Sequence, residues 1–472
     1  MRELAQLLLP AVRWDPTAGF APALPAVMRG IAAGVGGFVV EGGTRDAVAE
    51  LSGTIRRTAG DAPIVAIAPA DLTSSSWRTR PLSVPPAAAI ASLRDALVVR
   101  RVARAVAHEA RLAGCNAILA PSCDVPRTPR ADAFGLVAAD VAAASAEWID
   151  AAQAEGVLCF ASAFPGGGAV TDVLTGIPTV RESEDALYAS DLVPFRAAID
   201  AGVAGIVVAE ASYAALDTSG TPASLSRPIL GRLLRTQLGY DGLAVADASL
   251  LATRLGHRVR AADLVAAGVD IVLRPVNLDV ELRALIDALE HHTLDGERAH
   301  EAATRRRLRA EMAAGPVAAL KDERVDDAWL DETAERTISV VRGRNVRVTT
   351  PTEVAVVATR GDQAAAAIAG FTSGLVDAGE AASSVRPVTA PSAGTRAALV
   401  VIVHPPRGIS NTQQDVAALC AEARRLGRES VVVWCGHPAT TPDTPGASLT
   451  IACWTPSTPM LRATGRWLLR RV

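Results

Sequence analysis

The sequence is short of lysine, of aromatic residues and of net charge. Lys321 is its one lysine, aromatic residues make up 4% of the 472 residues, and 47 basic residues nearly balance 50 acidic ones. A formal net charge of −3 excludes a broad basic surface for nucleic acid. The shortage of aromatic rings also disfavours platforms on which single strands stack. We therefore expect no nucleic-acid partner.

The sequence also lacks the patterns that are typical of metal sites, disulfide bonds and membrane-spanning segments. The six cysteines form no C-x-x-C pair, so we expect reduced thiols in apolar cores. Adjacent histidines at 291 and 292 point to different sides of a helix, which disfavours a metal site. No apolar run approaches the ~20 residues that span a bilayer, and Glu3 stands where a signal peptide carries positive charge. We expect a cytoplasmic protein with no membrane partner, no metal and no cofactor.

Short apolar, β-branched runs recur through the first 300 residues, with Ala-rich helical patterns between them. The runs are residues 4–11, 37–41, 63–68, 116–121, 157–164, 205–210, 242–247 and 270–274. Segments such as 92–113 are long enough for a helix that crosses back over a parallel sheet. Eight β-then-α units predict a (β/α)8 TIM-type barrel over residues 1–315. A doubly wound open sheet is the alternative, and the strand count disfavours it.

A smaller second domain is predicted after a charged region. Residues 304–309, with four arginines between Glu301 and Glu311, read as a solvated helix face, and residues 316–340 read as a linker. Apolar runs at 354–359, 398–403, 430–435 and 449–454 then alternate with helical stretches. This pattern predicts a three-layer α/β sandwich domain over residues 341–472, with a loop at 383–396.

Chemistry in such a barrel is expected at the carboxyl ends of the strands and in the loops that follow them. Asp247 ends the seventh predicted strand and Glu210 ends the sixth. Asp124 follows the fourth strand, and Ser162 and Gly167 lie at the end of the fifth.

Four segments stand out around the predicted strands five to seven: FPGGG at 164–168, AGVAGIVVA at 201–209, PASLSRPIL at 222–230 and LRTQLGYDG at 234–242. They resemble glycoside hydrolase family 3, in particular its β-N-acetylglucosaminidase branch. The resemblance extends over nearly the whole chain, including the charged linker and the smaller domain. It implies retaining hydrolysis of a β-linked sugar or amino sugar. It also implies a small carbohydrate ligand.

The resemblance places the nucleophile at Asp247. A carboxylate on a rigid strand end suits that role, because it must stay ionised and reach the sugar. An aspartate in front of Ala248 also suits the N-cap of a helix, so both interpretations stay open.

Many residues depart from the family's motifs. The Lys-His pair of Lys-His-Phe-Pro-Gly-His-Gly is Ser162 and Ala163, and the inner histidine is Gly167. The Asp-Ser-His triplet with the acid/base histidine is matched by Asp172-Val173-Leu174, which keeps only the carboxylate. The remaining departures are Asp71 within the former Asp-Gln-Glu-Gly-Gly stretch, Asp132 in place of a sugar-binding arginine, and Glu210 in place of a histidine.

Two hypotheses follow from these losses. In the first, a hydrolase with altered residues uses Glu210 as acid, since burial among residues 207–209 should raise its pKa towards the working range. Asp172 is a second candidate partner, and a salt bridge is the alternative role for Glu210. Asp124, Asp71, Ser162 and Gly167 are then candidates for substrate binding, although Asp124 equally suits a turn. In the second hypothesis, a non-catalytic protein keeps the barrel to bind a sugar or a partner. The oligomeric state stays open.

The replaced residues predict slow turnover. Each lost group that tightens on the transition state costs about 10²–10³ in rate. We therefore expect hydrolysis of a chromogenic β-N-acetylglucosaminide at least ~10³ more slowly than by a member with intact motifs. Steady-state kinetics at neutral pH test this expectation. A turnover near ~10 s⁻¹ would show that the replacements do not matter.

Overall fold

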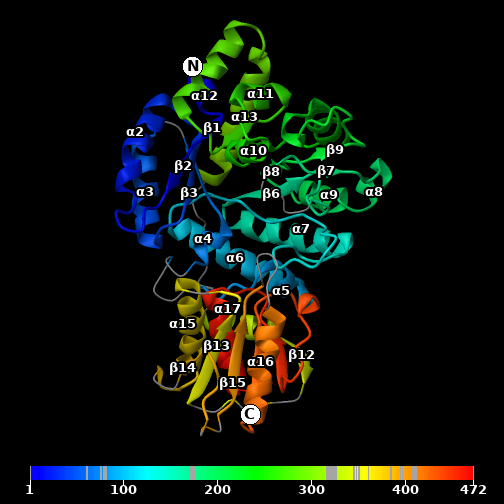
Figure 1. Cartoon of the computed structure of the whole chain (residues 1–472). Helices are drawn as coiled ribbons and strands as arrows, with labels where there is room; N and C mark the ends of the chain where they lie inside the picture. The colour runs from blue at the N-terminus through cyan, green and yellow to red at the C-terminus, as the bar shows by residue number, and fades with distance from the viewer. Residues whose placement is uncertain are drawn as a thin grey trace.

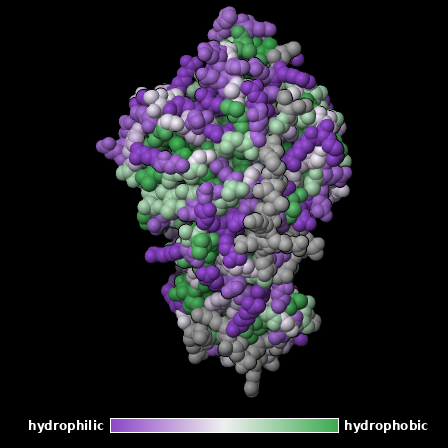
Figure 2. Space-filling view, turned by 180° about the vertical axis from the view of Figure 1, so that it is seen from behind, coloured by the Kyte–Doolittle hydropathy of each residue, from purple (hydrophilic) through white to green (hydrophobic). Residues whose placement is uncertain are grey.

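The computed structural model describes residues 2–59, 62–74, 77, 82–170, 176–314, 327–343, 346, 348, 351–359, 361–382, 385–393, 395, 397–405 and 412–470. They form a larger α/β domain followed by a smaller one, stacked end to end in Figure 1. No helix in these ranges is long and apolar enough to cross a membrane. On the face seen in Figure 2, hydrophobic residues are interspersed among hydrophilic ones over both domains.

The larger domain is a parallel barrel. The strands follow the order β1-β11-β10-β8-β6-β5-β4-β3-β2 around the sheet. Their bounds are β1 (Leu8–Leu9), β2 (Ala11–Arg13), β3 (Gly37–Glu41), β4 (Ile64–Ile67), β5 (Ala117–Ile118), β6 (Leu158–Phe164), β8 (Gly205–Val208), β10 (Leu243–Asp247) and β11 (Ile271–Leu273). A short separate pair, β7 (Thr179–Val180) and β9 (Ser212–Tyr213), lies outside this sheet. Each of the eight predicted runs contains strand residues, although Leu4 and Ala5 of the first run belong to helix α1 (Arg2–Ala5).

One interrupted strand closes the barrel. β1 pairs with β11, β2 pairs with β3, and Pro10 alone separates the two halves. Proline has no N–H to donate to a ladder, which accounts for the break. The sheet therefore has no open edge at this point, and the alternative of an open doubly wound sheet is excluded.

Helices cover the outside of the barrel. They are α1 (Arg2–Ala5), α2 (Leu24–Ala33), α3 (Arg45–Thr58), α4 (Pro69–Leu72), α5 (Ala87–Ser92), α6 (Ala96–Leu112), α7 (Ala138–Ala154), α8 (Glu184–Ala189), α9 (Leu192–Asp200), a π-helix (Pro228–Gln237), α10 (Ala248–Leu255), α11 (Ala261–Ala267), α12 (Leu278–Glu290) and α13 (Gly296–Ala314). α6 shows why they form: Asp95 caps its N-terminus, and Val98, Val102 and Val106 recur on its buried face.

The amino end of the barrel is closed by α13, contrary to the expected solvated arginine helix. Ala310 and Ala313 of α13 pack against the apolar barrel interior. Arg306 is 1% exposed and donates to the carbonyl oxygens of Gly36 and Ala62. The burial of Arg306 was missed because its partners are backbone carbonyl oxygens, which leave no acidic signal in the sequence.

Asp270 holds this end together. Its side chain is fully buried, and its carboxylate accepts hydrogen bonds from Arg235 and from Arg298, with Arg305 at 3.3 Å. The backbone N–H of Ala244 also donates to it, at 2.8 Å. One carboxylate thus ties the π-helix, α13 and two strands to each other.

The smaller domain is a three-layer sandwich, as predicted. Its sheet has the order β12-β17-β16-β15-β13-β14, with β12 antiparallel at one edge and the other pairs parallel. The strands are β12 (Ser339–Gly343), β13 (Thr352–Val357), β14 (Val385–Pro387), β15 (Leu399–Val403), β16 (Ser430–Trp434) and β17 (Leu449–Ala452). The helices are α14 (Asp327–Thr337), α15 (Asp362–Asp377), α16 (Thr412–Arg425) and α17 (Thr458–Arg470). β14 lies inside the segment that we predicted to be a loop.

A buried ionic cluster joins the two domains. Asp331 of α14 accepts hydrogen bonds from Ser83 of the barrel domain and from Arg462 and Arg466 of α17. Burial acts to raise the pKa of Asp331, but these donors outweigh it and hold the pKa below its usual value. Part of the predicted linker is thus the packed helix α14, and residues 316–326 lie outside the described residues. The predicted domain boundaries stay a prediction.

Removal of the Asp270 carboxylate should destabilise the barrel strongly. Asp270→Ala leaves three partly buried arginines without their buried acceptor, and we expect a loss of about 3 kcal/mol in the free energy of unfolding, measured by urea denaturation. Asp241→Ala removes an exposed acid paired with Arg309 and should cost less than about 1 kcal/mol. Equal effects of the two variants would contradict the role of Asp270.

Candidate active site

Asp247 lies at the carboxyl end of β10 and caps α10. Its Oδ1 accepts hydrogen bonds from the backbone N–H groups of Ser249 and Leu250, at 3.1 and 3.0 Å. Its Oδ2 accepts one from Nη1 of Arg274, at 2.6 Å. The side chain is 16% exposed. The carboxylate therefore caps the helix and is also fixed by a cation, while part of it stays accessible.

Arg274 and Glu41 extend this contact across the mouth of the barrel. Nε of Arg274 donates to Oε1 of Glu41 at 2.5 Å, and Arg13 donates to Oε2 of the same carboxylate at 2.7 Å. Burial acts to raise the pKa of Glu41, but the two guanidinium groups outweigh it and lower the pKa. A chain of alternating charges thus runs from β2 through β3 and β11 to β10. Glu41 and Arg274 are the last residues of two predicted strands, and this position could have marked them as candidate site residues.

Asp71 lies beside this chain, after β4. Its carboxylate accepts a hydrogen bond from the backbone N–H of Gly42 at 3.2 Å. Burial raises the pKa of Asp71, and the nearby charge of Glu41 acts in the same direction. The structure therefore brings this predicted substrate-binding residue to the mouth, on the β3–β4 side.

Glu210 follows β8, the strand next to β10, and is 5% exposed. The Ser224 hydroxyl donates to its Oε2 at 2.6 Å, and its Oε1 is buried with no hydrogen-bond partner in the described part of the chain. Burial raises the pKa of Glu210 to about 8, and the charge of Asp247 acts in the same direction. The Ser224 hydroxyl, the charge of Arg254 and the backbone N–H of Asp247 partly oppose this rise. Glu210 is thus mostly protonated at neutral pH.

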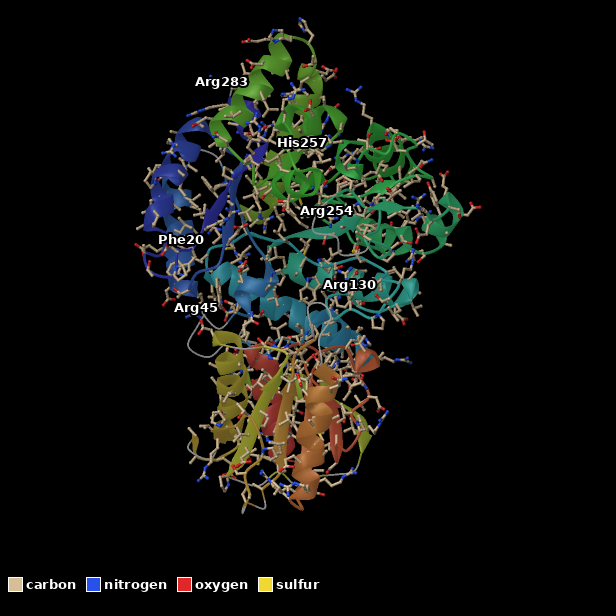
Figure 3. All side chains as sticks on the ribbon, viewed as in Figure 1. Phe20, Arg45, Arg130, Arg254, His257 and Arg283 are labelled. Carbon is tan, nitrogen blue, oxygen red and sulfur yellow. The ribbon has the colours of Figure 1, made fainter. Side chains whose placement is uncertain are left out.

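Arg254 of α10 supplies a second set of unpaired atoms near Glu210. Its Nε and Nη1 are buried, and within the described ranges neither has a hydrogen-bond partner. Asp247 caps the N-terminus of α10, and Arg254 lies in the last turn of the same helix. Figure 3 labels Arg254 near the middle of the barrel domain, with Arg130 between it and the smaller domain in that view. Native proteins rarely leave buried polar atoms unpaired, so this position stands out.

Asp124 organises the loop after β6. Its Oδ1 accepts hydrogen bonds from the backbone N–H groups of Gly167, at 2.8 Å, and of Ala163, at 3.2 Å. A Cβ atom at position 167 would lie 2.9 Å from Oδ2 of Asp124, closer than Cβ atoms normally approach. Burial raises the pKa of Asp124. The structure thus gives Asp124 and Gly167 a shared role in shaping the backbone, and it does not test their role in binding.

Of the remaining sequence-predicted residues, Ser162 and Asp132 are described by the structure and Asp172 is not. Ser162 lies in β6, and its carbonyl oxygen accepts the N–H of Cys123. Asp132 is held by Arg130 through two hydrogen bonds of 2.9 and 2.6 Å. Asp172 lies outside the described residues. Within the described ranges no group of three or more His, Cys, Asp or Glu residues is placed to hold a metal ion.

Comparison with known proteins shows which protein family matches the barrel domain. The family model described as "Glycosyl hydrolase family 3 N terminal domain" matches residues 34–308. The β-N-acetylglucosaminidase/β-glucosidase of Cellulomonas fimi is 33% identical over 229 residues, which cover 44% of this chain and 40% of that protein. β-Hexosaminidase A of Pseudoalteromonas piscicida is 32% identical over 226 residues, or 42% of this chain and 38% of that protein. The match thus spans about two fifths of these relatives.

A solved structure covers the whole chain. The glycoside hydrolase family 3 β-N-acetylglucosaminidase from Paenibacillus sp. str. FPU-7 superposes with a TM-score of 0.80 at 21% identity. The superposition covers 100% of this chain and 96% of that one. At this identity the likeness concerns the fold of both domains.

Proposed function

The chain belongs to glycoside hydrolase family 3, and we propose that its barrel hydrolyses a β-linked sugar or amino sugar with retention of configuration. Asp247 is the nucleophile and Glu210 is the acid/base. The observation that carries this proposal is Glu210 itself, a buried carboxyl next to Asp247 with a pKa of about 8. A general acid must hold its proton at working pH, and burial gives Glu210 that property.

The proposed reaction proceeds in two steps and needs no cofactor. Asp247 attacks the anomeric carbon and forms a glycosyl ester, while Glu210 gives its proton to the leaving oxygen. Glu210 then takes a proton from water, which attacks the same carbon and releases Asp247. Arg274 donates a hydrogen bond to Oδ2 of Asp247, and it stabilises the carboxylate that leaves in the second step.

Catalysis in this proposal is impaired relative to members with intact motifs. The carboxylate of Asp247 accepts hydrogen bonds from Arg274 and from two backbone N–H groups, and these bonds lower its reactivity as a nucleophile. The motif positions at 162 and 132 carry no cation to hold sugar hydroxyls. A non-catalytic sugar- or partner-binding protein is the second candidate function. The observation that favours it is that the Asp247 carboxylate already accepts three hydrogen bonds within the protein.

Covalent labelling tests the nucleophile. Incubation with a panel of activated 2-fluoro glycosides should add the mass of one fluoroglycosyl group, seen by intact mass spectrometry. The adduct should be absent from Asp247→Asn. If no sugar in the panel forms an adduct, and sugar binding survives in Asp247→Asn, the non-catalytic alternative replaces the hydrolase.

The pH profile tests Glu210. Because its pKa is about 8, the protonated form persists at neutral pH and is lost as the pH rises through that value. We therefore expect kcat/KM for a glycoside with a poor leaving group to fall above pH ~8. Glu210→Gln should lower this kcat/KM by about 10²–10⁴ and should abolish the basic limb.

A pair of serine variants sharpens the pH test. The Ser224 hydroxyl favours the ionised form of Glu210, so Ser224→Ala should raise the pKa and move the basic limb to higher pH. Ser226 lies two residues away and donates to Asp217 instead, so Ser226→Ala should leave the limb in place. If Ser224→Ala does not move the basic limb of the kcat/KM profile, that limb reports the titration of another group.

A further inference from the structure

The buried guanidinium of Arg254 has no part in the reaction described above. α10 begins after Asp247, which caps it, and carries Arg254 in its last turn. An arginine at this end of a helix normally interacts with the helix dipole and keeps its charged head in water. Arg254 differs, because its Nε and Nη1 are buried and have no hydrogen-bond partner in the described part of the chain. A charged group in such surroundings calls for a partner of opposite charge.

Glu210 offers the matching acceptor. Its Oε2 accepts the Ser224 hydroxyl at 2.6 Å, and its Oε1 is buried and unpaired among the described residues. Burial raises the pKa of Glu210 to about 8, and the positive charge of Arg254 acts against this rise. A buried acceptor atom and two buried donor atoms thus lie in one electrostatic environment, and each lacks a partner.

The other ionisable groups on this side of the barrel supply no such cation within the described ranges. Asp247 is an acid, and the buried Tyr213 donates to a backbone carbonyl oxygen at 3.0 Å. Three further acids act electrostatically on Tyr213, namely Asp124, Glu182 and Asp191. The cations beside them are engaged, because Arg127 donates to Asp191 and Arg130 donates to Asp132. Arg254 is therefore the cation with buried N–H groups to offer Glu210.

The proposed reaction needs Glu210 in both protonation states. In the first step Glu210 gives up its proton, and in the second step its carboxylate must accept one from water. Burial disfavours that carboxylate, so the second step calls for a group that stabilises it. Formation of the glycosyl ester neutralises Asp247, whose charge acts to raise the pKa of Glu210. The attraction of Arg254 persists through this change.

We infer that Arg254 is the positioning residue for the ionised form of Glu210. After the proton has passed to the leaving oxygen, the guanidinium donates from Nε and Nη1 to the buried carboxylate and orients it towards water. The water oxygen then bonds to the anomeric carbon, its proton passes to Glu210, and the ester bond to Asp247 breaks. This inference rests on the proposed acid/base role of Glu210, and Arg254 acts only through that residue.

The lifetime of the glycosyl-enzyme tests this role, because it reports the second step alone. The full-length chain is labelled with an activated 2-fluoro glycoside, excess reagent is removed, and loss of the adduct is followed by intact mass spectrometry at several pH values. Arg254→Met should still form the adduct. It should lose the adduct about 3–10-fold more slowly at neutral pH, since fewer Glu210 side chains are ionised, and the rise of this rate with pH should move to higher pH.

Two further measurements separate this role from a structural one. Arg254→Lys keeps the positive charge and should recover much of the rate of adduct loss. Azide is an anionic nucleophile that needs no base, so it should release the adduct from Arg254→Met as fast as from the unchanged chain. Arg254→Gln is a second neutral variant, and circular dichroism confirms that each variant folds.

Arg283→Met is the matched control. Arg283 is an exposed arginine of α12, and Figure 3 labels it above Arg254, near the top of the barrel domain. Its replacement should leave the lifetime of the adduct unchanged. Equal lifetimes in Arg254→Met and the unchanged chain would overturn the role of Arg254 while Asp247 and Glu210 keep theirs. Slow loss that neither Arg254→Lys nor azide restores would make Arg254 a structural residue. The absence of any adduct in the unchanged chain would refute the proposed reaction, and this inference with it.

Discussion

The ion pair between Arg274 and Asp247 organises the mouth of this barrel. It joins the last strand to the one before it, and through Glu41 it also reaches the strands at the start of the chain. The charges at the mouth therefore satisfy each other within the protein. A mouth built in this way offers a ligand fewer free cations than a site that binds sugar hydroxyls through charged donors.

The two carboxyl groups that matter most have different hydrogen-bond partners. Asp247 is held by a cation and by the start of a helix, whereas Glu210 has one hydroxyl partner and an oxygen with none in the described structure. The second environment raises the pKa of Glu210 to about 8. Two neighbouring strands thus carry carboxyl groups in different surroundings, which is the arrangement that acid-assisted displacement requires.

The sequence predicts the strands of this protein better than it predicts its contacts. Runs of β-branched residues mark each strand, because a buried parallel strand must be apolar on both faces. Glu210 was predictable for the same reason, as an acid next to an apolar run. Arg274 and Glu41 also end predicted strands, but their contact was not predictable, since 233 residues separate them and only closure of the barrel brings them together. Arg306 was misread because its partners are backbone carbonyl oxygens.

The buried cluster of Ser83, Asp331 and Arg462 bears on how the protein can be divided. Each of these groups relies on a partner from the other domain or from the helix between them. A gene fragment that encodes the barrel alone would leave Ser83 without its acceptor and would uncover Ala88 and Ala89, which pack against Ala334. The two domains therefore depend on each other for the burial of this cluster, although the sequence divides them in two.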